Sequence, residues 1–103
     1  MPENQHKPWT FLTNHTRVLI AIFQNPDIRA RDIAALTGIT ERSTQRIIAE
    51  LEAGGYLAHE KVGRRNHYQV KPAANLRHPR EQDVEIGFLL ELLSSIDQTA
   101  TGS

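Results

Sequence analysis

The segment Asp32-Ile-Ala-Ala-Leu-Thr-Gly-Ile-Thr40 has the composition of a tight turn between two helices. Its first half has the apolar spacing of a short helix over residues 31–37. Gly38 is the usual residue for a left-handed C-cap, and Thr40 is a strong N-cap for a second helix over residues 41–53. A short helix, a glycine, an inward-turning apolar residue and a capped helix together predict a helix-turn-helix.

The predicted helix over residues 41–53 has two different sides. Its inner side should be formed by Thr44, Ile47, Ile48 and Leu51, which recur at helical spacing. The first half of its outer side carries Arg42, Ser43, Gln45 and Arg46. Arginine can bind guanine bidentately, glutamine can bind adenine, and serine can reach a phosphate or a base edge. Alternatively these residues form only solvated i,i+4 pairs, such as Arg46 with Glu50. The position directly after a helix-turn-helix turn favours DNA binding.

Other elements surround this pair of helices. A helix is expected over residues 14–24, capped by Thr13 or Asn14 and ended by Pro26. A hairpin should follow the two helices, with strands over residues 56–62 and 67–70.

The predicted tip of this hairpin is basic. It reads Gly63-Arg64-Arg65-Asn66, and two arginines at an exposed turn suit contact with phosphate or the minor groove. Charged tips are also common on hairpins for solubility alone. The tip indicates a DNA-binding wing only because it follows a recognition-type helix.

The stretch from Thr40 to Leu57, followed by Gly63-Arg-Arg-Asn-His-Tyr-Gln-Val70, resembles the recognition helix and wing of winged helix-turn-helix transcription regulators of the MarR and ArsR type. The resemblance covers about residues 12–70. It implies a mainly α fold with a small β-hairpin wing, in which a three-helix core is followed by the wing and a C-terminal helix. It also implies sequence-specific binding of double-stranded DNA by a prokaryotic regulator, usually as a homodimer on a palindrome. The resemblance carries over to Thr40, Ser43 and Arg46 on the helix and to Arg64 and Arg65 in the wing. The side-chain chemistry adds Arg42, Gln45 and Asn66 to the residues that we expect to contact DNA.

An amphipathic helix is expected over residues 80–97. Its apolar stripe consists of Val84, Phe88, Leu89, Leu92, Leu93 and Ile96. This stripe either completes the core of the monomer or forms the seam of a homodimer. Its size favours the homodimer, to which Trp9 and Phe11 could also contribute.

Charge is distributed unevenly along the chain, although the net charge is zero. Residues 29–80 contain ten Lys and Arg against five Asp and Glu, whereas residues 81–103 contain five Asp and Glu and no Lys or Arg. This asymmetry predicts a basic face that can meet phosphate and an acidic end that points away from it.

The remaining expectations concern domain limits and excluded chemistry. We expect a flexible N-terminal arm over residues 1–10, the DNA-binding domain over residues 11–72, and a disordered tail over residues 98–103. The chain has no cysteine, its histidines lack the spacing of a metal site, and no catalytic motif is present. We therefore expect a cytoplasmic protein without enzyme activity, cofactor, metal or membrane contact, for which a small-molecule effector is possible but not indicated. The alternative function is a winged-helix protein–protein interaction module that does not bind DNA.

Overall fold

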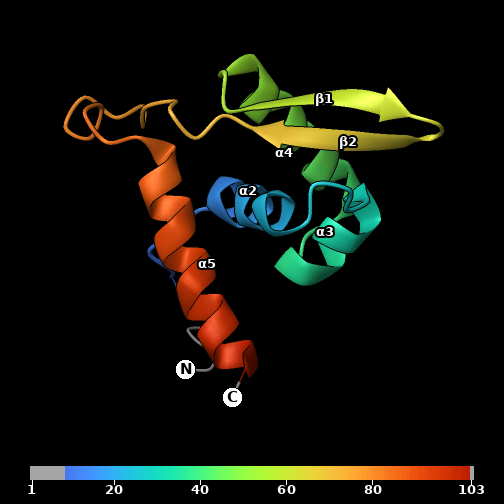
Figure 1. Ribbon diagram of the computed structural model, residues 1–103, viewed down its shortest axis with the longest axis horizontal. Coiled ribbons are helices and arrows are strands. Elements are labelled where there is room, and N and C mark those ends of the chain that lie inside the picture. The colour runs from blue at the N-terminus through green and yellow to red at the C-terminus, as the bar shows by residue number, and fades with distance from the viewer. Residues whose placement is uncertain (1–8, 103) are drawn as a thin grey trace.

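The structure is a computed structural model that describes residues 9–102, with side chains described for residues 9–95. Its elements follow the chain as α2 (Asn14–Gln24), α3 (Ala30–Thr37), α4 (Glu41–Ala53), β1 (Leu57–Val62), β2 (Arg65–Val70) and α5 (Ile86–Gly102). Helix α2 lies at the centre and contacts α3, α4, α5 and β2 (Figure 1). The hairpin lies over one side of these helices, and α5 crosses the end of the molecule that is opposite α3. The expected mainly α fold with a β-hairpin wing is confirmed.

Local capping interactions fix the helix ends. The Thr13 side chain accepts a hydrogen bond from the Thr16 backbone at the start of α2, and the Thr40 side chain accepts one from the Ser43 backbone at the start of α4. Gly38 ends α3 in the left-handed region with φ of 79°, a conformation that costs little only for glycine. Helices α2 and α4 therefore have the bounds expected from the sequence, and α3 begins one residue earlier than expected.

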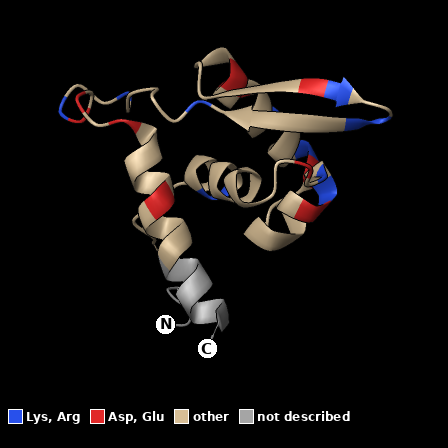
Figure 2. Ribbon diagram, viewed as in Figure 1, with Lys and Arg blue, Asp and Glu red and all other residues tan. Residues whose placement is uncertain are grey.

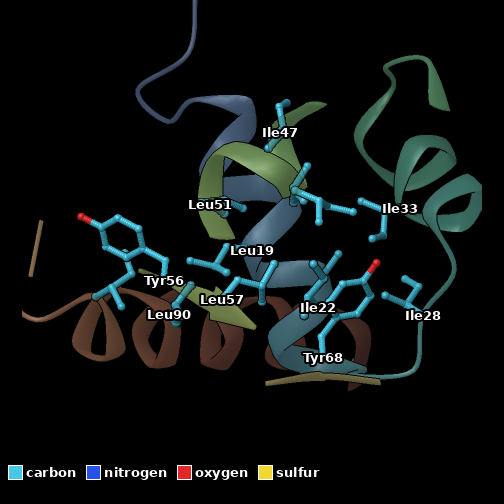
Figure 3. Close-up of a cluster of buried hydrophobic side chains, with 14 residues drawn as sticks. Leu19, Ile22, Ile28, Ile33, Ile47, Leu51, Tyr56, Leu57, Tyr68 and Leu90 are labelled. Carbon is cyan, nitrogen blue, oxygen red and sulfur yellow. The ribbon is translucent and has the colours of Figure 1, made fainter. Parts of the chain in front are cut away.

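One hydrophobic core joins all the elements. Leu19 and Ile22 of α2 pack with apolar residues of the other helices and with Tyr56, Leu57 and Tyr68 of the hairpin region (Figure 3). The expected inner side of α4 is confirmed, because Thr44, Ile47, Ile48 and Leu51 are all buried. Some large apolar side chains lie outside this core. Leu36 on α3 is 71% exposed, and Trp9 and Phe11 are exposed and contact each other edge to face.

The hairpin is tighter than the sequence suggested. Strands β1 and β2 pair antiparallel with Val62 opposite Arg65, so that the turn contains only Gly63 and Arg64. Glycine at the first of these two positions, with φ of 67°, suits the sharp turns that match the twist of a hairpin. The expectation of a four-residue turn over residues 63–66 is therefore wrong, because residues 65 and 66 already pair as the first residues of β2.

The start and the end of the last helix also differ from expectation. Helix α5 begins at Ile86 rather than near Arg80, because residues 72–85 form a loop that is held by a hydrogen bond from Tyr56 and by another within the loop. The Tyr56 hydroxyl donates to the Asn75 carbonyl at 2.5 Å, and the Leu76 amide donates to the Val84 carbonyl at 2.9 Å. The helix continues to Gly102, so residues 98–102 are not the expected tail. Ser103 and residues 1–8 of the expected N-terminal arm lie outside the described residues.

No helix in the described part of the chain is both long and apolar enough to cross a membrane.

Candidate nucleic-acid interface

The outer side of α4 presents the polar residues that the sequence predicted there. Arg42, Gln45 and Arg46 are exposed, and Ser43 is half-buried. Thr40 is exposed at the N-terminal end and holds the first turn of the helix through its hydrogen bond to the Ser43 backbone. Because the opposite side of α4 is packed into the core, the helix is held rigidly while its arginine-bearing side faces solvent.

Arg46 belongs to a chain of polar contacts that links α4 to α2. Its Nη1 donates to Glu50 Oε2 at 3.2 Å, and the other carboxylate oxygen of Glu50 lies 2.6 Å from His15 Nε2. The hydrogen bond with His15, together with the nearby charge of Arg46, holds the pKa of Glu50 below its ordinary value of 4.5. The i,i+4 pair of Arg46 and Glu50 was visible in the sequence. The contribution of His15 was not, because it lies 35 residues away in the chain.

The wing is attached to the loop between α2 and α3. The Arg65 guanidinium donates to the Asp27 carbonyl at 2.8 Å, and His67 Nδ1 lies 2.7 Å from the Asp27 carboxylate. The backbone of β2 joins this contact, because the Tyr68 amide donates to the Pro26 carbonyl at 2.9 Å. These three contacts fix the direction of the wing relative to the helix-turn-helix.

The four predicted tip residues are placed differently from one another. Gly63 and Arg64 form the exposed turn, and Arg65 is exposed although one of its nitrogens is bonded to Asp27. Asn66 is half-buried, and its amide donates to the Tyr68 hydroxyl at 3.4 Å.

A small basic pocket lies between the wing and the start of α3. Its volume is about 310 Å³, and its lining includes Arg29 and Lys61 as well as Arg64 and Arg65. Figure 2 shows basic segments at the wing tip and around α3 and α4, with acidic segments on β1 and α3 between them. Sequence reasoning did not select Arg29 or Lys61 as site residues. The sequence could have indicated these two residues only by their positions. Arg29 directly precedes α3, and Lys61 lies two residues before the turn.

The apolar residues of α5 divide between two sides. Ile86 and Leu90 are buried against the core, whereas Phe88 and Leu92 are 70% and 60% exposed. The other residues of the predicted dimer stripe fall elsewhere: Val84 lies before the helix and is 43% exposed, Leu89 and Leu93 are half-buried, and the side chain of Ile96 is outside the described part.

A larger groove of about 670 Å³ lies beside the first turn of α5. The residues around it include Phe11, Leu19 and Leu89 among the apolar ones, and the paired side chains of His15 and Glu50. Within residues 9–95, no group of three or more His, Asp or Glu side chains is placed to hold a metal ion.

Known proteins are similar to this chain in sequence and in fold. The sequence profile described as the MarR family matches residues 10–65. The uncharacterized protein MJ1254 of Methanocaldococcus jannaschii is 33% identical over 67 residues, which is 64% of this chain but only 14% of that protein. The crystal structure of the AntR antimony-specific transcriptional repressor superposes with a TM-score of 0.51 and 19% identity, covering 85% of this chain and 69% of AntR. With its helix-turn-helix and wing, the chain belongs to the MarR family of winged-helix, DNA-binding transcription regulators.

Proposed function

We propose that the protein recognises a specific sequence of double-stranded DNA by inserting α4 into the major groove. The observation that carries this proposal is the division of α4 into two sides. Thr44, Ile47 and their neighbours fix one side to the core, while Arg42 and Arg46 are exposed on the other. A helix braced in this way can enter a major groove about 12 Å wide without rearranging.

Each group on this surface has a proposed role. Arg42, Gln45 and Arg46 read base edges, because their donors and acceptors match those of guanine and adenine. Ser43 and Thr40 lie at the N-terminal end of the helix, where small hydroxyls bind the phosphate backbone.

The wing contacts the DNA that flanks the major groove. Arg64 and Arg65 bind phosphates or enter the minor groove, since both are exposed at or beside the turn. Asn66 would reach the duplex only if its amide left the Tyr68 hydroxyl.

The proposed active form is a homodimer that acts as a cytoplasmic transcription regulator. Phe88 and Leu92 lie one turn apart on the exposed side of α5. Val84 lies just before the helix and is also exposed. Pairing with a second copy would bury these side chains together with the half-buried Leu89 and Leu93, and Ile96 is assigned to the same seam. A two-fold dimer would place two copies of α4 on the halves of a palindromic site.

Selection of bound sites from a random duplex library tests the proposal. We expect enrichment of one motif with two-fold symmetry and half-sites about 10 base pairs apart or a multiple of this. Enrichment of no motif would contradict sequence-specific recognition, and a single unrepeated half-site would contradict the dimer.

The second candidate function is a protein-interaction module, supported by the 670 Å³ groove beside α5. A salt titration with random duplex DNA separates the two candidates. Binding that weakens steeply with salt is expected of a protein that displaces counterions from phosphates. Absence of binding at low salt would favour the interaction module.

A further inference from the structure

We infer that the pocket between the wing and α3 is a phosphate-binding site, formed by Arg29, Lys61, Arg64 and Arg65. This inference rests on the proposed function, in which the bound group is a phosphodiester of the DNA strand that passes between the wing and the major groove. It adds Arg29 and Lys61 to the DNA-contacting surface, and it adds a built cavity where the sequence indicated only an exposed basic tip.

The first observation is that cations from separate parts of the fold converge on one cavity. Arg29 precedes α3, Lys61 is on β1, Arg64 is in the turn and Arg65 begins β2, yet all four line the same pocket of about 310 Å³. The described ion pairs involve none of these four residues. Because like charges that line one cavity repel, an anion in the pocket would offset a repulsion that Asp27, the one carboxylate of the lining, can offset only in part.

The second observation concerns Asp27, which is the one acidic residue of the lining. Its carboxylate is already hydrogen-bonded to His67 Nδ1 at 2.7 Å, and its carbonyl accepts from Arg65 Nη2 at 2.8 Å. These contacts hold Asp27 at the edge of β2. They also place the Arg65 guanidinium at the pocket with its remaining N–H groups available to a ligand.

The third observation is the backbone around the pocket. Helix α3 starts at Ala30, which is part of the lining, and its N-cap residue Arg29 supplies no side-chain hydrogen bond to the first turn. The N–H groups of a first helical turn favour an anion. The Asp32 and Ile33 amides already donate to the Arg29 carbonyl, so the amide of Ala30, which is part of the lining, is the one that would supplement the four cationic side chains. A phosphate offers enough acceptor oxygens to satisfy several of these donors at once, and arginine in particular matches its geometry.

The test compares Arg29→Ala with Lys61→Ala against a control of equal charge change. The control is Arg77→Ala with Arg80→Ala, because both residues are exposed in the loop of residues 72–85, at the other end of the hairpin from the turn (Figure 1). All four residues lie outside the core, so circular dichroism should show the wild-type fold for both double variants. The ligand is the duplex obtained by site selection.

We expect the pocket double variant to lower the slope of log affinity against log salt by roughly 2, which is about one per lost phosphate contact, and the control to leave the slope unchanged. Replacing single phosphates by uncharged methylphosphonates should weaken wild-type binding at one position beside the major-groove contact. The pocket variant should be insensitive to that replacement. Equal salt slopes for the pocket variant and the control would overturn the inference while leaving the proposed function intact.

If the wild-type protein binds no duplex, the proposed function fails, and inorganic phosphate becomes the probe. Phosphate that shifts the backbone amide NMR signals of Ala30 and Asn66 in the wild type, but not in the pocket variant, would support a site for a free phosphate group. Absence of such shifts would overturn the site itself.

Discussion

Helices α4 and α5 each bury one side in the same core, but their other sides differ in chemistry. The free side of α4 carries Arg42 and Arg46, whereas the free side of α5 carries Phe88 and Leu92. Since the inner sides of both helices are apolar, it is the solvent-facing side that distinguishes their functions. Hydrogen-bond donors on a rigid helix suit nucleic acid, and exposed large apolar residues suit a protein surface.

The largest expected effect is on the stability of the fold, and it compares a buried leucine with an exposed one. Leu90 is fully buried where α5 meets the core, whereas Leu36 on α3 is 71% exposed. Leu90→Ala should lower the free energy of unfolding by about 2–5 kcal/mol, because it removes buried methyl groups and leaves a cavity. Leu36→Ala should change it by no more than about 0.5 kcal/mol. Urea denaturation of both variants measures the difference, and equal losses would show that α5 is not part of the core.

The next effect concerns the free side of α5. Phe88→Ser combined with Leu92→Ser should convert the proposed dimer to a monomer, since burial of each side chain contributes about 1.5–3 kcal/mol. Light scattering at high micromolar concentration measures the mass, and unchanged circular dichroism serves as the control for folding. A wild-type protein that is already monomeric under these conditions would remove the proposed dimer.

The smallest effect concerns the contact between α4 and α2. Because the pKa of Glu50 is lowered in the folded protein, its ionised form stabilises the fold above the ordinary glutamate pKa, and this stabilisation is lost as the pH falls through the lowered value. Glu50→Gln should therefore lower the melting temperature at pH 7 and have a diminishing effect in acid. Melting curves from pH 7 to pH 3 check this, and a difference that grows in acid would contradict the assigned pairing with His15.

The sequence predicted those features that depend on neighbouring residues. The ends of α2 and α4 follow from local caps such as Thr13 and Thr40, and the two sides of α4 follow from helical spacing. The sequence places the start of α5 too early, because Val84 and Phe88 have helical spacing although Val84 lies before the helix. Only the fold shows that the backbone at residue 84 instead bonds to Leu76.

The features of the site that could not be predicted join residues far apart in the chain. Arg65 and Asp27 are separated by 38 positions, and Arg29 and Lys61 line the same pocket only because the loop before α3 lies along the edge of β2. Neither the sequence around Arg29 nor that around Lys61 indicates that the two segments lie side by side. The sequence therefore predicts the basic tip but not the pocket behind it.

A matched pair of double variants tests whether the solvent-facing side of α4 reads DNA. Arg42→Ala with Arg46→Ala should weaken binding to the selected duplex by about 1–3 kcal/mol per arginine and relax base preference. Arg77→Ala with Arg80→Ala, which removes the same charge from the far loop, should leave both affinity and preference near those of the wild type. If the two double variants bind the selected duplex equally well, α4 is not the reading helix.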